Sequence, residues 1–244
     1  MLISVITCTW NSEQFLDESI SSVLSQDYPN IEYVFVDGGS TDTTLDRIAE
    51  VPGTKKLVRN IRGGISRAMN AGVEVATGDI VAHLHSDDFY LDQHVLSLVA
   101  KEMKNHDAGW CFGRIKRVVD GMLVSESYTA PEYSYARLLR GNFIPHPATF
   151  VRRGWMIRAG QFNHNLKYAM DYDMWLKLAA FGDPIELHEP LTAFRVHQGS
   201  LSSRNRFDAM AEDFRVRLGH CSRDPISRIE HYLRYAVRRY RARK

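Results

Sequence analysis

The sequence predicts an α/β protein with an open, mostly parallel central sheet flanked by helices. Over about the first ninety residues, short strand-like runs alternate with segments whose apolar residues repeat at helical spacing. The first of these runs carries no charge, which is typical of a parallel strand covered on both faces. Polar turns follow these runs, and in open parallel sheets ligands bind at the carboxyl ends of the strands. We therefore expect a ligand site at that edge of the sheet.

The first strand and the first helix follow directly from the residue pattern. Residues 2–10, "LISVITCTW", carry no charge and predict a buried strand. Asn11-Ser12 offers a helix N-cap. Apolar residues then repeat at helical spacing over 15–24, and we expect this helix to stop before Asp27–Pro29.

Three further strands and two helices complete the first half. A tight turn follows the second strand, and its Ser40 and Thr41 can cap the next helix. A later helix is expected to end by Gly78. In chain order, the expected strands cover 31–37, 55–60 and 79–85, and the helices follow residue 41 and cover 64–76.

After roughly residue 100 the pattern changes to short strands, loops and one clear helix, as expected for a smaller α+β specificity region built onto the first half. The division is into 1–100, 101–222 and a tail, 223–244. Within 101–222 we expect two strands over 108–127 joined by a turn at Asp120-Gly121, an irregular or extended stretch at 142–153, a helix at 168–182 and an extended segment at 184–197.

Composition sets broad limits. The chain has 244 residues, 44% of them apolar, so it can build a proper core. The net charge of +2 gives no reason to expect a nucleic-acid partner. The three widely spaced cysteines indicate a reducing compartment rather than a disulfide framework. Because no run is long enough for a membrane span and the start lacks signal-peptide features, we expect a soluble, cytoplasmic protein.

The tail is strongly basic. Residues 223–244 contain eight arginine and lysine residues against two acids, and apolar residues repeat along one helical side. A basic amphipathic helix can lie on an anionic membrane surface, which would place the protein peripherally at the inner face of the membrane. Packing on the protein's own body and a homodimer contact are the competing interpretations.

An acidic pair, Asp87-Asp88, follows the fourth expected strand in "HLHSDDFYLD". One of these carboxylates can simply cap a helix starting near Leu91. The functional interpretation is that one of them holds Mg²⁺ or Mn²⁺. These ions prefer oxygen ligands and are typically shared between one or two carboxylates and the phosphates of a substrate.

A nucleotide pocket is indicated by "VFVDGGSTD". Asp37 stands just past a buried strand, where its carboxylate can accept hydrogen bonds from a base or ribose, and the glycines after it allow a ligand close to the backbone. A plain polar turn is the competing interpretation. The pattern is not G-x-G-x-x-G, so no dinucleotide cofactor is indicated.

The stretch from His83 to Asp88 also approaches the H-x-H-x-D-H signature of metallo-β-lactamase-type hydrolases. His83 and His85 share one face of the expected strand. However, the sixth position is Asp88 instead of histidine, and that class does not predict the preceding strand–helix alternation. We expect the two histidines to lie near the site without forming a zinc centre.

The segments "ISVITCTWNSEQFLDESISSVLSQDYPNIEYVFVDGGSTDTT" and "GISRAMNAGVEVATGDIVAHLHSDD" together resemble the family 2 glycosyltransferases, which have the GT-A fold. The similarity resumes at "HPATFVRR", "YAMDYDMWLKLA" and "FRVHQGSLS". The resemblance implies an inverting enzyme that uses a divalent cation to move a sugar from a nucleoside-diphosphate donor to an acceptor hydroxyl.

For the nucleotide, the resemblance implies that Thr7, Thr9 and Trp10 line the base and ribose pocket. It also implies that Asp37 hydrogen-bonds the base, usually uracil. Arg67 stands where an acid is common in the family, and this cation can instead reach donor phosphate. A solvated helix charge is the alternative for Arg67.

For the chemistry, the resemblance makes Asp87 and Asp88 the acidic metal motif, with Asp88 as the metal ligand and Asp87 nearer the ribose or sugar of the donor. Asp171 in "AMDYD" takes the place of the catalytic base, with Asp173 as the alternative. A carboxylate that removes the acceptor proton is typically worth ~10²–10⁴-fold in rate. Asp171 as an ordinary acid at a helix start is the competing interpretation.

Two histidines complete the expected site. His197, in the Gly/Ser-rich stretch "RVHQGSLS", is expected near the diphosphate or the metal, or as a structural loop residue. His146, between two prolines, is a candidate for acceptor contact. The expected partners are a UDP-sugar donor and a saccharide or lipid-linked acceptor. The alternatives are a sugar nucleotidyltransferase and a non-enzymatic, metal-dependent carbohydrate-binding domain.

Overall fold

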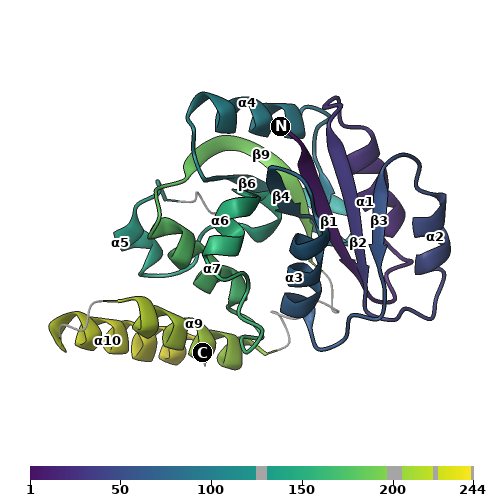
Figure 1. The fold of residues 1–244 in the computed structure, drawn as a ribbon. Coiled ribbons are helices and arrows are strands. Elements are labelled where there is room, and N and C mark those ends of the chain that lie inside the picture. Colours follow the sequence, from purple (N-terminus) through teal and green to yellow (C-terminus); the bar gives the residue numbers. More distant parts are fainter. Residues whose placement is uncertain (125–130, 197–204, 222–224, 243–244) are drawn as a thin grey trace.

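In the computed structural model, residues 1–124, 131–196, 205–221 and 225–242 are described. One continuous sheet runs through both expected halves of the chain, in the order β3-β2-β1-β4-β8-β6-β9-β5, with β7 paired to β6 (Figure 1). The first four strands in this order form the parallel half of the sheet, which the sequence pattern predicted. They are β3 (Lys55–Val58), β2 (Ile31–Asp37), β1 (Ile3–Thr9) and β4 (Ile80–His83).

The second half of the sheet is mixed. β8 and β6 continue from β4 in antiparallel fashion, β9 runs parallel to β6, and β5 closes the edge against β9. Asp120 and Gly121 both have positive φ, 51° and 77°, which confirms the expected turn between β6 and β7. The strand bounds are β5 (Phe89–Tyr90), β6 (Trp110–Val119), β7 (Met122–Val124), β8 (Thr149–Arg152) and β9 (Ile185–Arg195).

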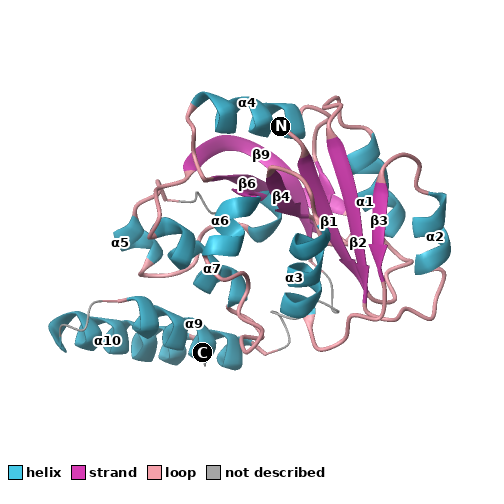
Figure 2. Cartoon of the chain, in the orientation of Figure 1, coloured by secondary structure: helices cyan, strands magenta, loops and turns pink. Residues whose placement is uncertain are grey.

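Helices cover both faces of the sheet (Figure 2). The amphipathic helix α3 packs on β1 and β2, whereas α1 lies against β5. A short 3₁₀ helix at His146–Ala148 precedes β8. The helix bounds are α1 (Leu16–Leu24), α2 (Thr44–Glu50), α3 (Ile65–Val75), α4 (Val95–Asn105), α5 (Tyr135–Leu138), α6 (Arg153–Arg158), α7 (Met170–Ala179), α9 (Arg206–His220) and α10 (Pro225–Arg241).

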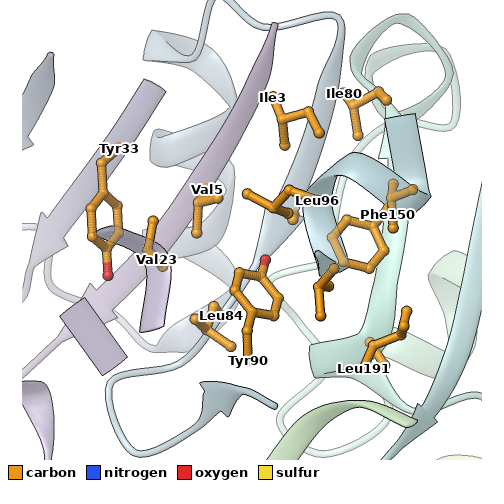
Figure 3. Close-up of a cluster of buried hydrophobic side chains, with 14 of the residues drawn as sticks. Ile3, Val5, Val23, Tyr33, Ile80, Leu84, Tyr90, Leu96, Phe150 and Leu191 are labelled. Atoms are coloured by element: carbon orange, nitrogen blue, oxygen red, sulfur yellow. The ribbon is translucent and has the colours of Figure 1, made fainter. Parts of the chain in front are cut away.

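Two hydrophobic clusters, one on each face of the sheet, take up the apolar side chains of the strands. Along β1, Ile3 and Val5 belong to one cluster and Ile6 and Cys8 to the other, as the alternation of side chains in a strand requires. Figure 3 shows the first cluster, where residues from β1, β4, β8 and α4 meet. The two-sided burial fixes the positions of the strand ends, and these ends carry the site.

Three helix starts differ from the sequence expectation. α1 begins at Leu16 instead of after Asn11-Ser12, and α4 begins at Val95 instead of near Leu91. Ser40 does not cap α2, because its hydroxyl bonds the Asp37 carboxylate. In each case polar residues that resemble helix caps hold the loops at the strand ends instead.

The basic tail forms α10, as expected, and it packs on α9, a helix that the sequence analysis missed. Phe214 of α9 stacks on Tyr235 of α10 with ring centroids 4.4 Å apart. α9 in turn packs on α7, so one face of the tail is anchored to the body of the protein. Within the described ranges, no helix is both long and apolar enough to cross a bilayer.

Gly72 allows α3 to approach β1 closely. A Cβ at this position would lie 2.4 Å from Cγ2 of Ile6 and 3.3 Å from Cγ2 of Val36. We expect Gly72→Ala to lower the free energy of unfolding by about 1–3 kcal/mol, because both neighbours are fixed in the core. Urea unfolding measures the change.

Gly219→Ala is the matched control, because this helical glycine has open space around its Cβ position. That variant should gain about 0.5–1 kcal/mol from helix propensity. An equal gain in both variants would contradict the close packing of α3 on the sheet.

Candidate active site

The carboxyl ends of β1, β2 and β4 meet at one edge of the sheet. Thr9 pairs with Asp37 across β1 and β2, and Ile6 pairs with His83 across β1 and β4. The loop after β1 connects the other two: its Asn11 N–H donates to Ser40 Oγ at 2.9 Å, and its Ser12 hydroxyl accepts from Ser86 Oγ at 2.9 Å. Residues fifty positions apart in the sequence therefore share one rim.

Asp37 holds the turn after β2 in place through its hydrogen bonds. Its buried carboxylate accepts hydrogen bonds from the backbone N–H groups of Gly39 and Ser40 and from the hydroxyls of Thr9 and Ser40. Burial alone raises the pKa of Asp37, but these hydrogen bonds outweigh it and hold the pKa below its ordinary value. The carboxylate is therefore ionised and fixes the Gly-Gly turn.

Trp10 is the accessible member of the three expected pocket residues on β1 and the loop after it. Its side chain is 71% exposed, and its Cδ1 would lie 3.5 Å from a Cβ placed on Gly38. Thr7 and Thr9 are buried, with the Thr7 hydroxyl donating to the Leu84 carbonyl at 2.8 Å. The flat indole lies beside a glycine, where a planar base can approach both.

Two arginines lie near the same turn. Arg62, which the sequence analysis missed, places Nη2 3.6 Å from where a Cβ on Gly39 would be. The Ile61 N–H donates to the Asp37 carbonyl at 3.0 Å and holds this loop against the turn. Arg67 is exposed on α3, with its side chain against Gly63. Arg62 gave no sequence signal because its loop has no regular pattern.

The two acids after β4 have different surroundings. Asp88 is 1% exposed; its Oδ1 accepts from the Arg195 N–H at 3.0 Å, and its Oδ2 has no hydrogen-bond partner among the described residues. Burial, together with the charge of Asp87, raises the pKa of Asp88 well above its ordinary value. Asp87 is only half-buried. His197 lies outside the described residues.

Three histidines form a ring cluster between β4 and α7. His146 stacks on His85 with centroids 5.2 Å apart and lies 5.6 Å from both His83 and Trp175. Burial and the neighbouring His85 lower the pKa of His83 to about 3, so this ring is neutral. In the described part of the chain, no three histidine, cysteine or acidic side chains gather in a way that could hold a metal ion.

Asp171 begins α7 and has the environment of a base. It is half-buried, and its Oδ2 accepts from Asn142 Nδ2 at 3.1 Å. Burial raises the pKa of Asp171 to about 6, with a further contribution from the charge of Asp213. A carboxylate with a pKa near the working pH is suited to accept and release a proton.

Asp173, the alternative base, is already engaged. Its carboxylate pairs with His220 Nε2 at 2.9 Å and with Lys177 Nζ at 2.6 Å. Burial opposes the charge of Asp173, but these partners lower its pKa below the ordinary value. The structure therefore distinguishes the two acids of "MDYD" by environment, which their spacing alone did not.

The fold and these groups define the class of protein, a glycosyltransferase with the GT-A fold. The profile of glycosyl transferase family 2 matches residues 4–162, and the chain belongs to this family. This replaces the alternatives of a sugar nucleotidyltransferase, a zinc hydrolase and a non-enzymatic binding domain.

Individual relatives differ in length. A chondroitin synthase of Pasteurella multocida (strain Pm70) is 33% identical over 186 residues, which cover 74% of this chain and 19% of the synthase. The chain therefore spans about a fifth of that relative. The Escherichia coli protein "UDP-Glc:alpha-D-GlcNAc-diphosphoundecaprenol beta-1,3-glucosyltransferase WfgD" is 26% identical over 240 residues, 97% of this chain and 92% of WfgD.

Solved structures support the same fold. Residues 1–349 of S. aureus TarS in complex with UDP-GlcNAc give a TM-score of 0.76 at 23% identity, with 97% of this chain and 71% of that chain covered. A mannosyltransferase from Pyrobaculum calidifontis in complex with GDP-Man and Mn²⁺ gives 0.70 at 22% identity, with 96% and 69% covered.

Proposed function

We propose that this glycosyltransferase moves a sugar, with inversion, from a UDP-sugar to a hydroxyl of a growing glycan or lipid-linked saccharide. The observation that carries the proposal is the half-buried Asp171, whose pKa is raised to about 6 and whose carboxylate is oriented by Asn142. Inverting transfer is a single displacement in which the acceptor hydroxyl must lose a proton as it attacks. Asp171 takes that proton as the general base.

The donor lies along the rim of β1, β2 and β4 in this proposal. The base stacks on Trp10 beside Gly38, with Asp37 holding the turn beneath it. Arg62 supplies positive charge to the diphosphate. TarS, a structural neighbour, has been solved with UDP and with UDP-GlcNAc, which supports uracil as the base.

A divalent cation, Mg²⁺ or Mn²⁺, fits the acidic pair. The Asp88 Oδ2 atom without a partner shows unused oxygen-ligand capacity, but this side chain is 1% exposed. Asp87 is the member of the pair that reaches the surface. We therefore assign the metal to Asp87 and the anchoring of the loop to Asp88, which reverses the expectation from the sequence. The cation, when bound, neutralises the charge that develops on the leaving diphosphate.

The proposed acceptor class comes from the similarity of this chain to WfgD. WfgD aligns over nearly all of this chain and most of its own length, and its printed activity transfers glucose to a diphosphoundecaprenol-linked sugar. We infer an acceptor of the same class, a saccharide on a lipid diphosphate.

Isothermal titration with UDP, with and without Mn²⁺, tests the donor site. Wild type should bind UDP more tightly with Mn²⁺ present, and Trp10→Ala should weaken binding about tenfold or more, because base–aromatic stacking is worth ~1–3 kcal/mol. Phe207→Ala is the control, because Phe207 is also an exposed aromatic residue but lies on α9. This variant should bind UDP as the wild type does. Metal-independent binding, or equal loss in both variants, would overturn the proposed donor site.

A further inference from the structure

A cavity of about 480 Å³ lies between α9, α10 and the end of α5, away from the donor rim. Its lining is dominated by positive charge, with three apolar residues at its side. Figure 1 shows α9 and α10 as a pair below α7. The lining residues are Arg140, Arg206, Arg217, Arg234, Arg238, Arg241, Leu233, Val237 and Ala242.

The positive charge in this cavity is only partly compensated. Arg234 pairs with Glu230 at 2.8 Å and Arg238 with Asp213 at 3.8 Å. Among the described residues, the six arginines of the lining therefore form ion pairs with two carboxylates. Like charges held this close repel one another, so the cavity gains from a bound anion.

Arg217 gives independent evidence for a ligand. Its side chain is only 3% exposed, yet it lines the cavity, and its Nε has no hydrogen-bond partner among the described residues. A buried guanidinium donor without a partner is costly. An anion in the cavity would satisfy this donor.

The cavity adjoins the catalytic base. Nη1 of Arg238 would lie 4.0 Å from a Cβ on Gly141, and the next residue, Asn142, donates to Asp171. Arg217 also interacts with the side chain of Tyr172, the residue after Asp171. A ligand in the cavity therefore lies next to the segments that carry Asp171 and its partner Asn142.

Exposed apolar residues at the rim of the cavity indicate that its ligand is an amphiphile. Leu233 and Val237 line it and are 63% and 51% exposed, and Ile229 and Tyr240 extend this exposed apolar side of α10. A diphosphate matches the convergent guanidinium groups, since arginine binds phosphate in bidentate fashion. The exposed apolar side chains match an attached hydrocarbon chain.

We propose that this arginine-lined cavity binds the diphosphate of the lipid-linked acceptor and thereby directs the acceptor sugar to Asp171. The inference rests on the proposed function and names the part of the protein that selects its acceptor. The lipid chain leaves along Leu233 and Val237, so the tail recognises an individual lipid diphosphate, in contrast to a general anionic surface.

Binding of dodecyl diphosphate, below its micelle concentration, tests the site without requiring transfer. The variant Arg140→Gln/Arg241→Gln removes two guanidinium groups that form no ion pair with a described carboxylate, which keeps the fold intact. We expect its affinity for dodecyl diphosphate to fall about tenfold or more relative to wild type, because hydrogen bonds to charged groups are lost. Neutral dodecyl glucoside should bind wild type and variant with equal, weak affinity.

Arg228→Gln/Arg239→Gln is the matched control. It also removes two positive charges, but both of its arginines lie on α10 and neither lines the cavity. It should retain dodecyl diphosphate affinity within a factor of about two to three. Equal losses in the two double variants, accompanied by equal losses on phosphatidylglycerol vesicles, would show general surface attraction and overturn the proposal. Failure of wild type to prefer the diphosphate over the glucoside would also overturn it.

The proposed function is tested separately by UDP titration of the same proteins. Both double variants should bind UDP as wild type does, because the cavity lies away from Trp10 and Asp87. If the wild type binds dodecyl diphosphate but does not bind UDP, the UDP donor is rejected and the proposed anion site is retained. The opposite pattern would reject only the anion site.

Discussion

Replacement of Asp171 by asparagine is expected to lower kcat for sugar transfer by ~10²–10⁴-fold, the usual contribution of a general base. Asparagine keeps the size of the side chain and can accept one of the two hydrogen bonds that Asp171 receives, from Asn142 Nδ2 or from the Tyr172 N–H, while the basic oxygen is lost. UDP affinity should remain nearly that of wild type, because the donor rim does not involve this residue. UDP release in a donor panel measures the rate, and titration calorimetry measures the affinity.

Asp173→Asn is the informative comparison. Its ion pairs with His220 and Lys177 predict that this change destabilises the protein, with a much smaller effect on kcat of the remaining folded enzyme. Retained turnover in Asp171→Asn together with lost turnover in folded Asp173→Asn would transfer the role of base to Asp173.

The raised pKa of Asp171 adds a pH dependence to the same prediction. Because the pKa is about 6 instead of 3.8, the base is protonated and inactive below pH 6 in the wild type, and kcat/KM should rise as the pH passes through that value. The native state also binds this proton more tightly than the unfolded state does, so stability contributed by Asp171 is present at low pH and is lost between pH 4 and 6. Asp171→Asn should therefore be more stable than wild type by roughly 1–2 kcal/mol at pH 8 and equal to it near pH 4, allowing for partial solvent access.

The parallel half of the sheet was predictable because its signal is local. β1 and β4 are buried along their whole length and β2 along most of it, and a polar turn follows each of these strands, so the rim carrying Trp10, Asp37 and Asp87 followed from the order of elements. The start of α3 was predicted within one residue, whereas the starts of α1, α2 and α4 were not, because polar residues that resemble caps bond across loops. Ser40 is an example, since its partner is the Asp37 carboxylate.

The roles of individual side chains depended on contacts that a sequence does not contain. Exposure separates Trp10 from the buried Thr7 and Thr9, and ion pairs separate Asp173 from Asp171. The arginine-lined cavity draws on the end of α5 as well as on α9 and α10, and α9 itself was missed. Charge along the tail was visible in the sequence, whereas its convergence with Arg140 and Arg217 required the fold.

The second large effect is expected at Asp87. Asp87→Asn should remove the response of UDP affinity to Mn²⁺ and lower kcat by ~10²–10³-fold, because a cation that neutralises the leaving diphosphate is worth several kcal/mol. Manganese titrations of the UDP complex, read by calorimetry, measure the lost response.

The variant Asp88→Asn tests which of the two acids binds the metal. The buried Asp88 has a pKa raised well above its ordinary value, and the amide oxygen of asparagine can still accept from the Arg195 N–H. This variant should therefore fold normally and keep most of its Mn²⁺ response if Asp87 is the ligand. The opposite result, a lost response in Asp88→Asn and a retained one in Asp87→Asn, would return the metal to Asp88. It would also require the loop after β4 to open when the donor binds, because the Oδ2 atom of Asp88 is closed to solvent.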